Sequence, residues 1–163
     1  MSPDLAGVPA HVITVSDRSA AGARPDASGP ILVQALMTLG AQVTARIVPD
    51  GIDSVRGAIR AAVEAGARAV VTTGGTGLAP RDLTPEATAP LLARPLPGVA
   101  ERLRAVDAEA VPTAALSRGL AGVTEEGVVV VNVAGSTGAA RSAAVVLGAV
   151  LPHALAQLAG GDH

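Results

Sequence analysis

Two acidic residues follow stretches of this sequence that suit a phosphate-bearing ligand. Residues 72–87 read TTGGTGLAPRDLTPEA, so a glycine- and threonine-rich run leads within a few residues to Asp82. A separate Val-Pro-Asp stretch ends in Asp50. Glycine lets the backbone approach a ligand closely, and successive N–H groups can cradle an anion. Carboxylates beside bound phosphates hold Mg²⁺ or orient a nucleophile, and we expect one of these roles for Asp50 and Asp82.

A second loop of the same kind lies nearer the end of the chain. Gly135-Ser136-Thr137-Gly138 follows Asn132 and opens a long apolar helix pattern. A helix N-terminus beyond such a loop adds positive potential at a bound anion. Arg18, Arg81 and Arg118 are the candidate sources of positive charge for phosphate groups.

Each of these residues also has a structural explanation that involves no ligand. A glycine-rich strand-to-helix loop can be a tight turn only. Asp50 after a proline is typical of a turn, and Asp82 is placed to cap the helix that follows it. Ser117 fits a helix end better than a nucleophile, because no histidine is near it in sequence. Asp17 and Asp26 read as ordinary loop acids.

The composition excludes several classes of function. The chain of 163 residues has no Cys, no Phe, Tyr or Trp, and its 12 basic residues are all arginine. Thiolate catalysis, disulfides, cysteine-ligated metals, Schiff-base chemistry and a lysine-containing P-loop are therefore excluded. Without aromatic residues and with a net charge of -2, no nucleic acid partner is expected.

The length and the apolar content describe one domain. Apolar residues make up 49% of the chain and charged residues 16%, which is enough to form a core. We expect a single domain over residues 1–163 with an ordered core at about 10–159 and frayed ends. No apolar run is expected to span a membrane, and the first residues lack the pattern of a signal peptide, so a cytoplasmic protein without a membrane partner is expected.

Short β-branched and apolar runs predict strands, and apolar residues at helical spacing predict helices between them. The expected strands cover residues 11–16, 42–48, 69–73 and 127–134. The expected helices cover about 31–39, 52–65 and 99–108, with further helices from Thr84 and from Gly138 to about Leu158. Ser28 and Thr84 are the expected N-caps of their helices.

The alternation of strands and helices predicts a mainly parallel sheet covered on both faces. In such a sheet, ligands bind beyond the carboxyl ends of the strands. The polar strand ends expected to form one site are Ser16-Asp17-Arg18, Pro49-Asp50, Gly74 to Gly77, and Asn132 with Gly135 to Gly138.

The order of these motifs resembles a known family. The chain reads, in order, TVSDRSAAG, DASGP, IVPD, TTGGTGLAPRDLTPEA, PGVAERLR, ALSRGLAGV and NVAGSTGAAR. Together these blocks are similar to the molybdopterin adenylyltransferase family, the Mog/MoaB proteins of molybdenum cofactor biosynthesis. The resemblance covers about residues 11–158. It implies a three-layer α/β/α sandwich with a mostly parallel central sheet, assembled as a homotrimer.

The resemblance also implies a reaction and its participants. Enzymes of the family use ATP and Mg²⁺ to adenylylate the terminal phosphate of molybdopterin, with release of pyrophosphate. The product goes to a molybdenum insertase, which is the implied protein partner. Positioning and charge neutralisation contribute most of the catalysis in such transfers, which suits a chain without nucleophilic cysteine or lysine.

Carried over position by position, the resemblance assigns roles to single residues. Asp50 and Asp82 match the catalytic acids, and we expect them to hold Mg²⁺. The residues that match the nucleotide- and substrate-binding segments are Ser16, Asp17, Gly74, Gly75, Thr76, Gly77, Ser117, Arg118, Asn132, Gly135, Ser136 and Thr137. Many family members have Pro-Gly where this chain has Ala134-Gly135, a change that removes no hydrogen-bond donor.

Two other functions fit part of the pattern. A non-catalytic paralogue would bind molybdopterin with the same loops and keep the acids for structure. An unrelated nucleotide-binding α/β domain would need only the strand-end loops. Because this chain keeps both Asp50 and Asp82 and all motifs in order, the sequence favours the enzyme.

Overall fold

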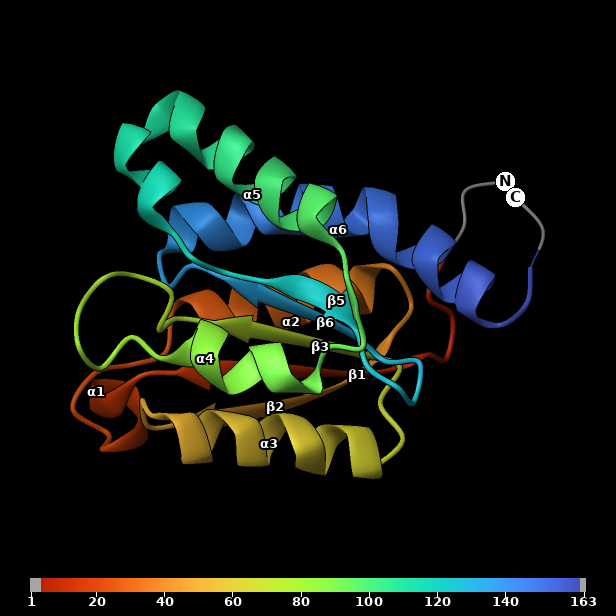
Figure 1. The fold of residues 1–163 in the computed structure, drawn as a ribbon, viewed down its shortest axis with the longest axis horizontal. Coiled ribbons are helices and arrows are strands. Elements are labelled where there is room, and N and C mark those ends of the chain that lie inside the picture. Colours follow the sequence, from red (N-terminus) through yellow and green to blue (C-terminus); the bar gives the residue numbers. More distant parts are fainter. Residues whose placement is uncertain (1–3, 162–163) are drawn as a thin grey trace.

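The apolar runs of the chain form the strands of one sheet. In a computed structural model, which describes residues 4–161, four strands run parallel in the order β2-β1-β3-β6 (Figure 1). Their bounds are Gln42–Val48 for β2, Pro9–Val15 for β1, Ala69–Thr73 for β3 and Val129–Val133 for β6. Beyond β6, the strands β5 (Ala121–Val123) and β4 (Arg94–Pro95) pair antiparallel. The mostly parallel sheet predicted from the sequence is confirmed.

Helices cover both faces of this sheet and complete three layers (Figure 1). One face carries α2 (Ser28–Thr38), α5 (Pro97–Ala110) and α6 (Thr137–Leu158), and the other carries α3 (Ile52–Glu64) and α4 (Thr84–Thr88). The short α1 (Asp17–Ala20) follows β1, and the 3₁₀ turns η1 (Ala89–Leu91) and η2 (Pro112–Leu116) follow α4 and α5. The predicted α/β/α sandwich is confirmed.

The register of the parallel strands brings their carboxyl ends level with one another. Val15 pairs with Val48, Thr14 pairs with Thr73, and Thr73 pairs with Val133. The loops that leave β1, β2, β3 and β6 therefore start along one edge of the sheet. This edge is where ligands bind in open parallel sheets.

β4 and β5 were not predicted from the sequence. They have 2 and 3 residues, which is too short for a hydrophobic period to show. β1 also begins at Pro9, earlier than the predicted residue 11, because its first residues pair with β2 from Gln42 onward.

The predicted fraying before residue 10 is wrong for the described residues 4–9. Leu5 is fully buried, and its N–H donates to the carbonyl of Leu39 at 2.7 Å. Gly7 donates to the carbonyl of Gly40 at 3.0 Å. These contacts fix the segment to the end of α2 before β1 begins. Residues 1–3 and 162–163, also predicted to fray, lie outside the described residues.

The predicted helix caps Ser28 and Thr84 are wrong, because both residues are the first residue inside their helices. The Asp26 carboxylate instead accepts from the N–H of Gly29, in the first turn of α2, at 3.0 Å. The hydroxyl of Thr84 donates back to the carbonyl of Gly74 at 2.9 Å. The Ser28 hydroxyl accepts from the hydroxyl of Thr73, the last residue of β3, at 3.0 Å. Both hydroxyls therefore contact the edge of the sheet and do not cap a helix.

α6 corrects the expectation that no segment is long and apolar enough to cross a membrane. Its 22 residues pass that test by length and composition, and α6 is the one described helix that does. Its buried side, which includes Ala143, Leu147 and Leu151, belongs to the core that α6 shares with α2 and α5. A core helix passes the same test, and this packing explains the apolar composition.

The core consists of aliphatic side chains, so its stability depends on close packing of small groups. Leu147 of α6 is 1% exposed, whereas Val145, two residues earlier, is 76% exposed. We predict that Leu147→Ala lowers the free energy of unfolding by about 2–5 kcal/mol, through lost burial and a cavity. The matched control Val145→Ala should change it by no more than about 0.5 kcal/mol. Urea unfolding followed by far-UV circular dichroism measures both, and equal effects would contradict the packing.

Candidate functional site

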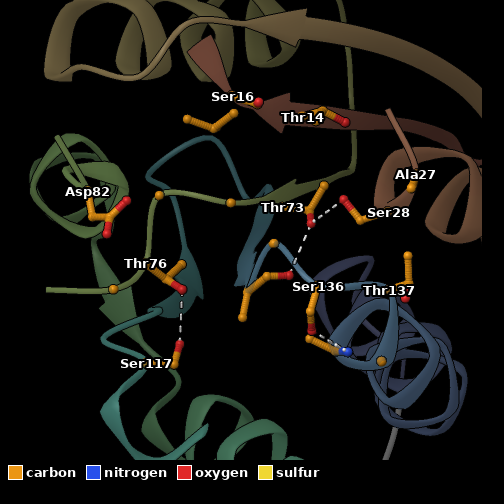
Figure 2. Close-up of a pocket in the computed structure, with 18 of the residues that line it drawn as sticks. Thr14, Ser16, Ala27, Ser28, Thr73, Thr76, Asp82, Ser117, Ser136 and Thr137 are labelled. Atoms are coloured by element: carbon orange, nitrogen blue, oxygen red, sulfur yellow. Dashed lines mark hydrogen bonds between the residues drawn. The ribbon is translucent and has the colours of Figure 1, made fainter. Parts of the chain in front are cut away.

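The loops at the carboxyl edge of the sheet enclose a cavity of about 1000 Å³. Its walls come from the ends of β1, β2, β3 and β6, from the start of α6, and from α5 with η2. Figure 2 shows side chains from several of these segments around it, among them Ser16, Thr76, Asp82 and Ser136. The volume is in the range of small-molecule and cofactor sites.

Two glycines after β3 are required by close contacts, one with the backbone of Val15 and one with the side chain of Thr84. Gly74 has a φ of +105°, and a Cβ atom there would lie 2.2 Å from the carbonyl oxygen of Val15. Gly75 has a φ of +68°, and its Cβ would lie 2.3 Å from the Thr84 hydroxyl. The loop can therefore pass this closely over β1 and α4 only with glycine at both positions.

Asp82 closes a turn at the far end of this loop. Its carboxylate accepts from the N–H of Ala79 at 3.1 Å, and its own N–H donates to the Ala79 carbonyl at 2.9 Å. A Cβ at Gly77 would lie 2.8 Å from the same carboxylate, so the glycine leaves room for the acid. Asp82 does not cap α4 and lines the cavity instead.

Asp50 and Asp17 hold each other at the ends of β2 and β1. The N–H of Asp17 donates to the Asp50 carboxylate at 3.1 Å, and the N–H of Asp50 donates to the Asp17 carboxylate at 2.9 Å. Burial is the largest cause that raises the pKa of Asp50 above its usual value, and the carboxylates of Asp17 and Asp82 raise it further. The Asp17 N–H and the Arg81 guanidinium lower this pKa in part.

This arrangement fits a cation that is shared with a phosphate ligand. Within residues 4–161, no group of three or more His, Asp or Glu side chains forms a metal site by itself. Mg²⁺ is commonly held by one or two carboxylates together with substrate phosphates and water. The Asp82 carboxylate is among the causes that raise the pKa of Asp50, and a cation held by both acids would offset this repulsion.

The loop after β6 lies directly against the loop after β3. A Cβ on Gly135 would lie 3.2 Å from the Cα of Gly74, so only a residue without a side chain fits there easily. Ser136 caps α6, because its hydroxyl accepts from the N–H of Ala139 at 3.0 Å. With Thr137, these residues bring the N-terminus of a long helix into the cavity wall, where it favours an anion.

The structure adds cavity residues that the sequence reasoning did not assign. Asp26, taken for an ordinary loop acid, lines the cavity and accepts from the Thr14 hydroxyl at 2.7 Å. Ser28 lines it too, with its hydroxyl 3.0 Å from that of Thr73 (Figure 2). Both belong to the DASGP block, which could have marked them. Arg24 joins the predicted Arg18 and Arg81 as a cavity-lining cation.

The wall formed by α5 and η2 had no signal in the sequence. Val106, Asp107, Val111 and Leu116 line the cavity from this side. Val111 and Leu116 are each 55% exposed, so the wall presents aliphatic surface opposite the glycine loops. This wall becomes a neighbour of the strand ends only through the fold.

The structure brings most of the predicted site residues to this one cavity. The predicted residues that line it are Ser16, Asp17, Asp50, Gly74, Gly75, Thr76, Gly77, Asp82, Ser117, Gly135, Ser136 and Thr137. Arg118 and Asn132 are not among its lining residues, and their contact with a ligand stays a prediction.

Asn132 is a buried core residue, 3% exposed. Its amide nitrogen donates to the hydroxyls of Thr72 and Thr88 at 3.0 and 3.1 Å, and its amide oxygen accepts from the N–H of Leu120 at 3.1 Å. The side chain joins β6 to β3, α4 and the segment before β5. Its polar groups are used within the protein.

Comparison with known proteins places this chain in a family. Residues 11–153 match the family described as "Probable molybdopterin binding domain". The chain is 45% identical over 160 residues to the molybdenum cofactor biosynthesis bifunctional protein of Synechococcus elongatus, covering 98% of this chain and 50% of that protein. It is 40% identical over 148 residues to the molybdopterin adenylyltransferase of Pyrococcus furiosus, covering 88% and 87%.

A solved structure agrees with these matches. The Mog protein from Mycobacterium ulcerans superposes with a TM-score of 0.87 at 39% identity, covering 93% of this chain and 99% of that one. The chain spans about half the length of the bifunctional relatives that it matches.

The raised pKa of Asp50 makes a prediction about stability and pH. A carboxyl whose pKa is higher in the folded than in the unfolded state weakens the fold once pH rises through the folded pKa. We predict that Asp50→Asn is more stable than the wild type near neutral pH, by less than about 1 kcal/mol because the site is partly solvated. This advantage should vanish as pH falls below the ordinary aspartate value of 3.8.

Urea unfolding at a series of pH values measures this difference. Asp53→Asn is the matched control, since Asp53 is exposed on α3 and does not line the cavity. A difference between Asp50→Asn and wild type that does not depend on pH would contradict the electrostatic account.

Proposed function

The chain belongs to the family described as "Probable molybdopterin binding domain", and we propose that it is a molybdopterin adenylyltransferase. Its place in molybdenum cofactor biosynthesis follows from the family and from relatives that carry this role in their names. The observation that supports the proposed reaction most strongly is that Asp50 and Asp82 share one cavity with the glycine loops.

In the proposed reaction, an oxygen of the terminal phosphate of molybdopterin attacks the α-phosphorus of ATP. The bond between the α-phosphorus and the oxygen bridging to the β-phosphate breaks, pyrophosphate leaves, and adenylyl-molybdopterin forms. Asp50 and Asp82 would hold Mg²⁺ together with the ATP phosphates, and the ion would supply neutralisation of the charge on the leaving group. The acids cannot themselves neutralise phosphate charge, so their presence beside the loops favours a metal-dependent transfer.

The other groups of the cavity bind and orient. The backbone of Gly74 to Gly77 and the N-terminus of α6 both line the cavity and would bind the phosphates. Arg18, Arg24 and Arg81 add positive charge at the cavity wall. Holding two phosphate groups in line for attack can by itself contribute several orders of magnitude in rate.

A non-catalytic molybdopterin-binding protein is the second candidate. One observation favours it. The carboxylates of Asp50 and Asp17 each accept from the other residue's N–H, and the Asp82 carboxylate accepts from an N–H within its own turn. The acids thus have structural roles that need no metal. The two candidates differ in whether ATP is consumed.

The relatives named bifunctional support a protein partner that continues the pathway. In them, a region matching this chain is about half of a longer protein. We propose that a molybdenum insertase receives the product, either on the same polypeptide or as a separate chain.

The purified protein incubated with molybdopterin, ATP and Mg²⁺ tests the proposal. Mass spectrometry should detect adenylyl-molybdopterin, and its formation should require both the protein and Mg²⁺. Molybdopterin that stays bound and unmodified while ATP is not consumed would favour the non-catalytic candidate.

We predict that Asp82→Asn lowers turnover by about 100- to 1000-fold, the range for loss of one group that stabilises charge in a transition state. Asparagine keeps an oxygen that can accept from the Ala79 N–H, so the turn should persist. Asp53→Asn, on the exposed side of α3, is the control for the same chemical change outside the cavity. Turnover near the wild-type level in Asp82→Asn would remove the assigned role.

A further inference from the structure

The loop of residues 76–82, which carries Asp82, is hydrogen-bonded to one neighbouring segment of the protein. Within residues 4–161, the hydrogen bonds that join residues 76–82 to a segment beyond their own turn all come from Ser117 and Arg118. The N–H of Arg118 donates to the Thr76 carbonyl at 2.8 Å. The Ser117 hydroxyl donates to the Thr76 hydroxyl at 3.2 Å, as Figure 2 shows.

The Arg118 guanidinium holds this loop at both ends of its turn. Nε donates to the Gly77 carbonyl at 2.9 Å, and Nη2 donates to the Asp82 carbonyl at 2.7 Å. Nη1 forms an ion pair with Glu86, the first acid of α4. The hydrogen bond between the Arg118 guanidinium and the Glu86 carboxylate is the largest cause that lowers the pKa of Glu86. The planar fork of the guanidinium suits this use, because it presents its donors in fixed directions.

The segment that carries Arg118 is itself anchored. Nη1 of Arg104, from α5, donates to the carbonyls of Ser117 and Gly119 at 3.3 and 3.0 Å. A continuous set of bonds therefore runs from α5 through residues 117–119 to the backbone on both sides of the Asp82 turn.

We propose that Arg118 is a positioning residue, which holds the backbone of residues 76–82, and with it the Asp82 carboxylate, in the geometry that the transfer needs. This inference rests on the proposed function. The guanidinium of Arg118 donates to the loop carbonyls and to Glu86 rather than into the cavity. The cationic side chains that line the cavity are those of Arg18, Arg24 and Arg81. Arg118 therefore acts through Asp82 and touches no phosphate.

The physical reason lies in the composition of the loop. Residues 74–77 contain three glycines, and glycine loses more conformational freedom on ordering than other residues. A loop of this kind keeps a carboxylate in place only if its backbone is held from outside. Displacement of a reacting group by about 1 Å can cost on the order of 100-fold in rate, so loss of the fork should affect turnover strongly.

Arg118→Lys and Arg118→Met test the proposal, with Arg102→Lys and Arg102→Met as controls. Arg102 is exposed on the same α5 that carries Arg104. Lysine keeps the charge but cannot reach three acceptors with a fork. We expect both Arg118 variants to fold cooperatively, with turnover lowered about 10- to 100-fold and the KM for ATP changed by less than about threefold.

Hydrogen–deuterium exchange of the ligand-free protein is the second measurement. Among residues 76–82, the N–H groups of Ala79 and Asp82 are hydrogen-bonded within the turn. They should exchange at least about tenfold faster in both Arg118 variants and at the wild-type rate in the Arg102 controls. Glu86→Gln, which leaves the bonds to the two carbonyls intact, should have a smaller effect in the same direction. This measurement needs no activity, so it tests the positioning role even if the wild-type protein transfers no adenylyl group.

Three results would overturn the inference. Unchanged exchange in residues 76–82 would show that Arg118 does not hold the loop. Wild-type turnover in Arg118→Met would show that the hold is not needed. A rise in the KM for ATP that exceeds the fall in kcat would show that Arg118 binds the nucleotide directly.

Discussion

Parallel pairing of β2, β1, β3 and β6 in level register is the constraint on which the site depends. With Val15 beside Val48 and Thr14 beside Thr73, the loops carrying Asp17, Asp50 and the glycines leave the sheet at one height. Residues 17, 50 and 82 are far apart in the chain, and no local feature of any of them would bring them together. A shift of one strand by one residue in register would turn its side chains to the opposite face of the sheet. The acid in the loop that follows the strand would then move away from the cavity.

Both the glycines and the acids of this site destabilise the fold. Gly74 and Gly135 lie so close together that a side chain on Gly135 would crowd the backbone of Gly74. The two loops can therefore approach each other only through glycines, which lose much conformational freedom on folding. Asp50 is placed where burial and neighbouring carboxylates disfavour its charge. Perturbed carboxyls in a cleft are typical of functional sites, and here a cation with its phosphates would remove the strain. The hydrogen bonds from the Arg118 guanidinium to the loop carbonyls, and those between Asp17 and Asp50, hold this arrangement.

Much of this could be predicted from the sequence, and the remainder depended on tertiary contacts. Long apolar runs predicted the parallel strands, and the strand-end rule predicted where Gly74 to Gly77, Asp50 and Asp82 would gather. The internal contacts of Asn132 could not be predicted, because it lies within β6, on the face of the buried Val130, and donates to Thr72 and Thr88 on other elements. The contacts of Arg118 could not be predicted, because its acceptors at Gly77 and Asp82 are 41 and 36 residues away. Asp26 and Ser28 were given local roles, although their partners Thr14 and Thr73 are on other elements.

In the proposed mechanism, Asp50 and Asp82 act together on one phosphate-bound cation. A double-mutant cycle of turnover, with Asp50→Asn, Asp82→Asn and the double variant, tests it most directly. Residues that act as a unit give strongly non-additive losses, so the account predicts that the double variant is about as slow as the slower single variant. Losses that multiply, so that the double variant is slower by the product of the two single effects, would show that the acids act independently and would contradict the account.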